Sequence, residues 1–73
     1  MTPLKRIRLE RGITQATLAD RIGIDQSHFS RIENDEAKAS ADVAAKIADE
    51  IGREWITELH ILYPERYGQQ AAA

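Results

Sequence analysis

The sequence predicts an all-α protein, folded as a compact bundle of four to five short helices. Three observations support this fold class. The chain has only 73 residues, which allows one domain with a small core. Apolar residues recur at intervals of three and four, which is the helical period. The apolar segments are separated by residues that favour the start or the end of a helix. Those that favour a start are Thr14, Asp25, Ser40 and Thr57, and those that favour an end are Gly12, Gly23 and Gly52.

Composition narrows the kind of protein this can be. The chain contains no cysteine, which excludes disulfides and thiolate metal ligands and fits a reducing cytoplasm. No apolar run approaches membrane length and we expect no signal peptide, so no membrane association is predicted. We expect one domain over residues 1–67, with its core in 4–52, a short C-terminal segment in 53–67, and a disordered tail in 68–73.

The first helix is expected to run from Pro3 to about Arg11. Proline suits a first helical turn because its missing N–H costs nothing there. Leu4, Ile7 and Arg11 are spaced to lie on one side of this helix, and Gly12 ends it.

The residues after Thr14 indicate two short helices joined by a tight turn. Thr14 can accept hydrogen bonds from the free amides of a helix over about 15–22, and Asp25 can do the same for a helix over about 26–34. Gly23 lies between them, where a sharp turn needs a positive φ that costs glycine little. This is the helix-turn-helix pattern, whose second helix enters the DNA major groove. Its expected buried contacts are Leu18, Ala19, Ile22, Ile24, Phe29 and Ile32.

The helix over 26–34 has one apolar and one polar side. At about 100° per residue, Phe29 and Ile32 fall together and define the buried side. Ser27 and Arg31 fall on the opposite side, which points outward. The flanks of that outward side carry Gln26, Ser30 and His28.

The remainder of the chain predicts a fourth helix and a short fifth one. Ser40 caps the fourth helix and Gly52 ends it. Thr57 caps the fifth, which reaches about Leu62 before Pro64 prevents its continuation. The C-terminal segment, residues 53–67, is too apolar to be a solvated tail on so small a domain. Part of it should therefore pack over the core, and part can form a contact with a second copy of the chain. The residues expected in a dimer interface are Trp55, Leu59, Leu62, Tyr63 and Tyr67.

Two stretches, LKRIRLERGITQ from Leu4 and LADRIGIDQSHFSRIEN from Leu18, follow one known pattern closely. From Leu4 to about Gly52 the chain resembles the lambda-repressor-like family of phage repressors, Cro proteins and bacterial XRE-type regulators. The resemblance implies a lambda repressor-like DNA-binding domain that binds double-stranded DNA sequence-specifically. It implies no enzyme, cofactor or metal, and the only histidines, His28 and His60, have no recognisable metal-ligand spacing.

The side chains of the outward face suit base recognition. Gln26 can bind adenine N6 and N7 together, and Arg31 can bind guanine O6 and N7. Ser27 can donate to or accept from either kind of base, and family repressors use residues at the start of this helix for bases. His28 can touch a base, a phosphate or only water.

Other residues are expected at the DNA backbone. The resemblance places Gln15 against a phosphate, which agrees with the positive N-terminus of a helix, although simple capping is the alternative. Further expected backbone contacts are Thr14, Ser30, Asn34 and Lys38. Asp35 and Glu36 depart from the family's basic loop and would repel phosphate unless they point away. By resemblance, Arg8 forms a partly buried structural ion pair with Glu33; a solvated arginine is the alternative.

Charge is distributed unevenly along the chain. The net charge is −2, but residues 1–31 carry six Lys/Arg against three acids, and residues 32–73 carry four against nine. The first part is therefore +3 and the second −5, which predicts modest DNA affinity with strong salt dependence.

These features favour a Cro-like, phage-type repressor that binds its operator as a homodimer in the cytoplasm of a bacterial or phage-infected cell. One alternative is an antitoxin that represses its own operon while its acidic C-terminal half binds a toxin. Another is the controller protein of a restriction-modification system, which has a similar size and fold.

Overall fold

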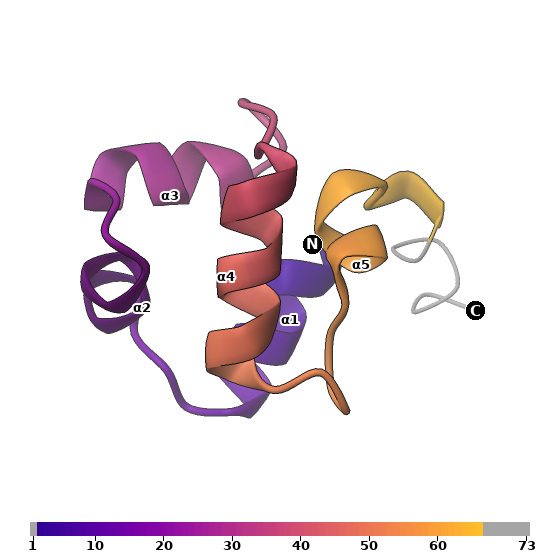
Figure 1. Cartoon of the computed structure of the whole chain (residues 1–73), viewed down its shortest axis with the longest axis horizontal. Coiled ribbons are helices and arrows are strands. Elements are labelled where there is room, and N and C mark those ends of the chain that lie inside the picture. Colours follow the sequence, from indigo (N-terminus) through magenta and orange to yellow (C-terminus); the bar gives the residue numbers. More distant parts are fainter. Residues whose placement is uncertain (1, 67–73) are drawn as a thin grey trace.

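The computed structural model describes residues 2–66 and places five helices in them (Figure 1). They are α1 (Pro3–Glu10), α2 (Gln15–Ile22), α3 (Gln26–Glu33), α4 (Ala41–Ile51) and α5 (Glu58–Leu62). These residues contain no strand, which confirms the all-α fold class for the described part. The expectations for Tyr67 and for the tail in 68–73 lie outside the described residues.

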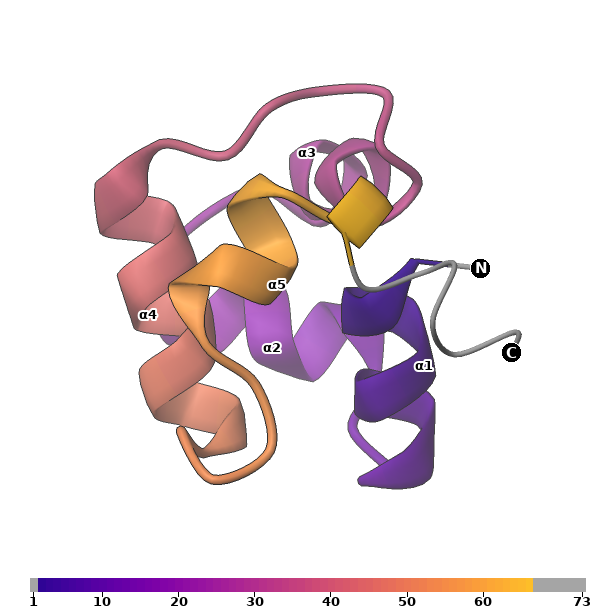
Figure 2. The same ribbon diagram turned by 90° about the vertical axis from the view of Figure 1, so that its right-hand side faces the viewer.

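The helix α4 forms the central wall of the core. It packs against α2 and against α5, and Figure 2 shows α5 lying across the space between α4 and α1. Ile56 and Ile61 are buried, so the C-terminal segment contributes to the core. The buried apolar side chains are Leu4, Ile7, Leu18, Ala19, Ile22, Phe29, Ile32, Ala44, Ile47, Ala48, Ile51, Ile56 and Ile61.

The helices α1, α2 and α3 end in the same way. The N–H groups of Ile13, Ile24 and Glu36 each donate to a carbonyl of the last turn of the preceding helix, at 3.1, 3.0 and 2.7 Å. The residue before each donor has a positive φ and is Gly12, Gly23 or Asp35, respectively. Aspartate tolerates this left-handed conformation better than most residues with a Cβ. The first two of these turns lie in short connections, which span residues 11–14 between α1 and α2 and residues 23–25 between α2 and α3.

The first helix was expected to reach about Arg11, with Arg11 on the side of Leu4 and Ile7. In the structure α1 ends at Glu10, and Arg11 is its C-cap residue and is exposed. Its guanidinium carbon lies 4.1 Å from the centroid of the Trp55 ring, an attractive cation–π arrangement. A Cβ at Gly52 would lie only 3.1 Å from Trp55 Cδ1, so glycine there lets the indole ring approach the end of α4.

His60 closes the start of α5. Its Nδ1 accepts a hydrogen bond from the backbone N–H of Thr57 at 3.0 Å, which completes a capping box. Burial, together with the positive charge of Arg6 from α1, lowers the pKa of His60 below its usual value. The neutral imidazole is therefore the form that the fold favours.

We expect acid to weaken the fold through His60. Because its pKa is lower in the folded than in the unfolded chain, the unfolded chain binds more protons, and stability falls as pH drops through about 6.5. Protonation also removes the acceptor for the Thr57 N–H. Thermal melts between about pH 7.5 and pH 5 should show this loss, and His60→Gln, which keeps a neutral acceptor at this position, should reduce it. The exposed His28 supplies the control, because His28→Gln should leave the pH profile unchanged.

Candidate nucleic-acid interface

The α2–turn–α3 unit is held rigidly by its sequence. Thr14 caps α2 by accepting from the Thr17 N–H at 3.1 Å, and Gly23 turns the chain with a φ of +79°. Leu18 and Ala19 are buried where α2 meets its neighbours, and Phe29 anchors α3 with no exposed surface. The backbone of α3 therefore has a fixed position relative to α2, which a helix that reads DNA requires.

One side of α3 faces outward and is polar. Gln26, Ser27, His28 and Arg31 are exposed, and Ser30 is half-buried. Phe29, Ile32 and Glu33 lie on the buried side. The structure thus brings the sequence-predicted base-reading residues together on one accessible helical surface, which we call the α3 polar face.

A buried ion pair connects α1 to the end of α3. Arg8 Nε donates to Glu33 Oε2 at 2.5 Å, and Arg8 Nη2 donates to Glu33 Oε1 at 3.1 Å. Glu33 has no exposed surface and Arg8 is 7 % exposed. The remaining Arg8 nitrogen, Nη1, donates to the Ile13 carbonyl oxygen at 2.6 Å. The bidentate geometry and the third hydrogen bond offset the cost of removing two charges from water.

Gln15 joins the same network. Its Nε2 donates to Glu33 Oε1 at 2.7 Å, so the buried carboxylate accepts from two helices and orients the first side chain of α2. Sequence reasoning considered a phosphate contact or simple capping for Gln15 and missed this bond. No helical spacing indicates it, because Gln15 and Glu33 lie on different helices and meet only in the folded chain. One amide hydrogen of Gln15 remains available to a ligand.

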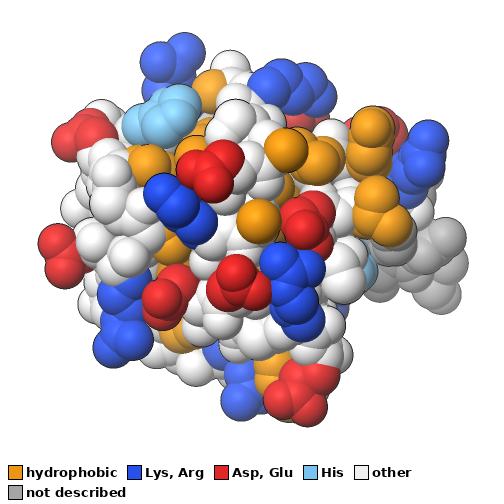
Figure 3. Space-filling view, viewed as in Figure 1, with side chains coloured by type: hydrophobic (Ala, Val, Ile, Leu, Met, Phe, Trp, Pro, Cys, Tyr) orange, Lys and Arg blue, Asp and Glu red, His pale blue; other side chains and the backbone are white. Residues whose placement is uncertain are grey.

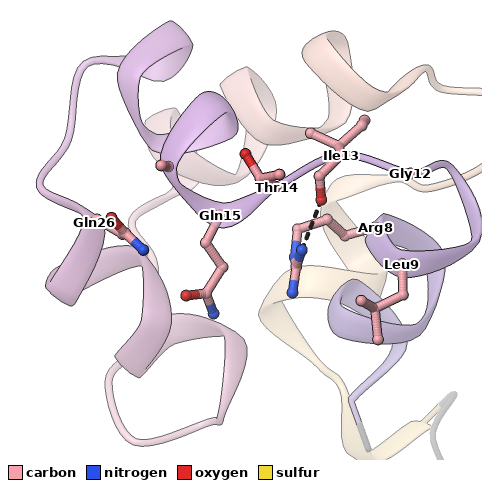
Figure 4. Close-up of a pocket in the computed structure, with 8 residues that line it drawn as sticks. Arg8, Leu9, Gly12, Ile13, Thr14, Gln15 and Gln26 are labelled. Atoms are coloured by element: carbon pink, nitrogen blue, oxygen red, sulfur yellow. Dashed lines mark hydrogen bonds between the residues drawn. The ribbon is translucent and has the colours of Figure 1, made fainter.

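The side chains at the starts of α2 and α3 line a common pocket. The pocket has a volume of about 430 Å³, and Figure 4 shows Gln15 lying between Gln26 on one side and the guanidinium of Arg8 on the other. The N-terminal amides of α2 lie at this pocket, and such amides favour an anion. Its lining is Arg8, Leu9, Gly12, Ile13, Thr14, Gln15, Ala16 and Gln26.

The expected cap by the Asp25 side chain is wrong. Asp25 occupies the N-cap position of α3, but its carboxylate makes no hydrogen bond to the helix amides. It accepts instead from the hydroxyl of Ser27, and both side chains are exposed. Thr14 differs, because its hydroxyl both caps α2 and donates to Thr17 Oγ1 at 2.8 Å.

The loop after α3 presents charges of both signs. Asn34, Asp35, Glu36 and Lys38 are all exposed, and Lys38 Nζ lies 3.7 Å from Asp35 Oδ1. Figure 1 places this loop at the α3 end of α4, and the connector after α4 at the opposite end. The loop therefore lies at the same end of the molecule as α3.

Reversing the charge of Glu36 should strengthen non-sequence-specific DNA binding. Glu36→Lys removes a repulsive carboxylate and adds a cation that can neutralise one phosphate, so the slope of log K against log salt should steepen by about 0.9. Fluorescence anisotropy on random duplexes across a salt series measures this slope. Glu54→Lys makes the same exchange in the distant connector and should leave the slope nearly unchanged. Equal effects of the two variants would show that the loop is remote from DNA.

Three large apolar side chains in α5 and the segments that flank it are exposed. Trp55, Leu59 and Tyr63 are 48 %, 49 % and 41 % exposed, and we call these three residues the α5 apolar patch. Figure 3 shows apolar side chains gathered over the α5 part of this face, whereas acidic and basic side chains alternate elsewhere on it. Leu62 instead packs against the core. Of the residues expected in a dimer interface, three are therefore accessible, one contributes to packing, and Tyr67 lies outside the described residues.

Two further features of residues 2–66 bear on function. None of their helices is long and apolar enough to cross a membrane. None of the groups of histidine, aspartate and glutamate among them is arranged to hold a metal ion.

Comparisons with known proteins agree with this geometry. A family model described as "Helix-turn-helix" matches residues 4–55. The chain is 38 % identical over 52 residues to the uncharacterized HTH-type transcriptional regulator YqaF of Bacillus subtilis (strain 168), covering 71 % of this chain and 68 % of that protein. It is 34 % identical over 61 residues to an uncharacterized HTH-type transcriptional regulator of Methanothermobacter thermautotrophicus (strain Delta H), covering 84 % and 88 %. No solved structure matches the chain at a significant level.

Proposed function

The chain belongs to the helix-turn-helix family of DNA-binding transcriptional regulators, and we propose that it represses transcription by occupying an operator as a homodimer. As a member of this family it is a regulator and not an enzyme. In the proposed mechanism α3 lies in the major groove, and the bound dimer excludes RNA polymerase. Repression by occupancy needs no chemical step and no cofactor. We propose that it takes place in the cytoplasm, which contains the operator DNA.

The observation that carries this proposal is the α3 polar face. Its exposed glutamine, serine and arginine offer the donor and acceptor groups that distinguish base pairs in the major groove. We assign base contacts to Gln26, Ser27 and Arg31, with His28 at the edge of the contact. We assign backbone contacts to Gln15, Thr14, Ser30, Asn34 and Lys38.

The pocket between α2 and α3 supports the orientation of this docking. The free amides at the start of α2 and the second amide hydrogen of Gln15 can bind a phosphate there. Gln26 lines the same pocket and begins α3, so a phosphate bound at α2 lies beside the first base-reading residue. A phosphate contact and a base contact are then made together, which sets the register of the helix in the groove.

Dimerisation is proposed through the α5 apolar patch. One helix-turn-helix reads only a few base pairs, and regulators of this size gain specificity by pairing on two half-sites. The patch exposes three large apolar side chains on a domain whose other described large apolar residues, Leu9 excepted, are mostly buried. A two-fold contact would remove them from water and would set the spacing of the two α3 helices.

An antitoxin remains the second candidate, because the C-terminal half that exposes these apolar residues is acidic: residues 32–73 carry nine acids against four Lys/Arg. Two of the acids, Glu58 and Asp49, pair with Arg53, at 2.5 and 2.7 Å. A toxin with a basic and apolar surface would fit the same region. Co-purification of a small basic partner from the native host would favour the antitoxin over a homodimer. The other alternative, a controller protein of a restriction-modification system, would be identified by its operator.

Selection of binding sites from random DNA tests the proposed function. We expect a pseudo-palindromic site with half-sites about 34 Å apart, or one helical turn. A salt titration on the selected site should give a slope of about 0.9 per neutralised phosphate. Recovery of unrelated sequences, with no enrichment even at low ionic strength, would contradict the proposal.

Charging the apolar patch should produce a monomer. Leu59→Glu places a carboxylate in the proposed two-fold contact, and because Leu59 is half exposed the fold should tolerate it. Sedimentation should report a dimer for the unmodified protein and a monomer for Leu59→Glu. Leu9→Glu is the matched control, since Leu9 is 51 % exposed on α1 and should leave the dimer intact. A monomer of the unmodified protein at high micromolar concentration, with or without operator, would exclude this interface.

A further inference from the structure

The hydroxyl of Ser27 is already committed within the chain. It donates to Asp25 Oδ2, and both residues are exposed at the start of α3. The direction of this bond is unambiguous, because an ionised carboxylate can only accept and a serine hydroxyl has a single hydrogen. Asp25 is free to hold Ser27 because its carboxylate does not cap the helix.

We propose that Asp25 determines which bases Ser27 can read. With its hydrogen donated to Asp25, Ser27 Oγ has only lone pairs to offer the major groove. The bases that present a donor there are adenine, through N6, and cytosine, through N4; guanine presents only acceptors, and thymine an acceptor and a methyl group. Ser27 therefore selects adenine or cytosine and disfavours guanine and thymine. The inference rests on the proposed docking of α3 in the major groove.

The charge of Asp25 acts in the same direction. Its carboxylate lies beside Ser27 on the accessible side of the helix start, where a negative charge attracts exocyclic amino groups and repels carbonyl oxygens. The sequence alone leaves Ser27 able to donate or to accept, whereas the contact with Asp25 leaves only the second role. The expected selectivity is that of a single hydrogen bond, about fivefold in Kd.

The test measures preference at one base pair with four proteins. Ser27→Ala first identifies the base pair concerned, as the position in the selected operator where preference is lost. Asp25→Ala then removes the acceptor, so that the Ser27 hydrogen is released to bind guanine or thymine. Asp25→Asn removes the charge but keeps an acceptor oxygen and a good N-cap residue. Competition with operators carrying each of the four bases at that position gives the ratios, and circular dichroism confirms that each variant is folded.

We expect the unmodified protein to prefer adenine or cytosine by about fivefold. Asp25→Asn should keep a weaker preference through its acceptor oxygen, and Asp25→Ala should lose the preference. Both Asp25 variants should bind all sequences more tightly, because a negative charge near the DNA is gone. A preference for guanine or thymine in the unmodified protein, or an unchanged preference in Asp25→Ala, would overturn the inference while leaving operator binding intact. Absence of any selected operator would instead contradict the proposed function.

Discussion

Arg8→Met should lower the free energy of unfolding by about 3–5 kcal/mol. The substitution keeps most of the side-chain volume but leaves the Glu33 carboxylate buried with no cation beside it. It also removes the donor to the Ile13 carbonyl, so the turn between α1 and α2 loses a hydrogen bond. A domain of this size has little stability to lose, and a large unfolded fraction is expected at room temperature. Urea denaturation followed by circular dichroism measures the change.

The control for Arg8→Met is Lys46→Met. Lys46 pairs with Asp42 at 3.3 Å on the exposed side of α4, and such an i,i+4 surface pair contributes about 0.5 kcal/mol or less. The double variant Arg8→Met/Glu33→Leu replaces both charges by apolar groups and should recover much of the loss. A change below about 0.5 kcal/mol for Arg8→Met would mean that the ion pair contributes no more than a surface pair.

Arg31→Ala should weaken operator binding by about 1–3 kcal/mol and relax the preference at one base pair. Arg31 is exposed near the middle of the α3 polar face, and a guanidinium binds guanine O6 and N7 with two parallel hydrogen bonds. Truncation leaves those acceptors without partners in the complex. Gel-shift titration against the operator and against single-base variants of it measures both the loss and its position.

Lys46→Ala is the matched control for Arg31→Ala. It also removes one positive charge, but from α4, outside the helix-turn-helix, and should change affinity little at moderate salt. If Arg31→Ala weakens binding to every sequence equally and reduces the salt slope by about one, Arg31 contacts a phosphate and not a base.

The positions and types of the helices could be predicted from the sequence. The caps at Thr14 and Ser40 and the glycine at Gly23 are local signals, because each concerns hydrogen bonds or backbone angles within a few residues. The side of α3 that is exposed also followed from local spacing, since Phe29 and Ile32 fix the buried direction. The match to one helix-turn-helix pattern extended this local evidence to the family.

The contacts between helices were decided by the tertiary structure. The donation from Gln15 to Glu33 and the stacking of Arg11 on Trp55 have no signal in helical spacing. Each depends on side-chain directions after packing, and a glutamine or an arginine at a helix end has several partners of similar energy. The sequence by itself determined where helices form and which faces are apolar, because these depend on neighbours in the chain. Apart from the Arg8–Glu33 pair, which the resemblance implied, only the tertiary structure decided how polar side chains pair between helices, because burial and distance across helices select among bonds that the isolated segments could make equally well.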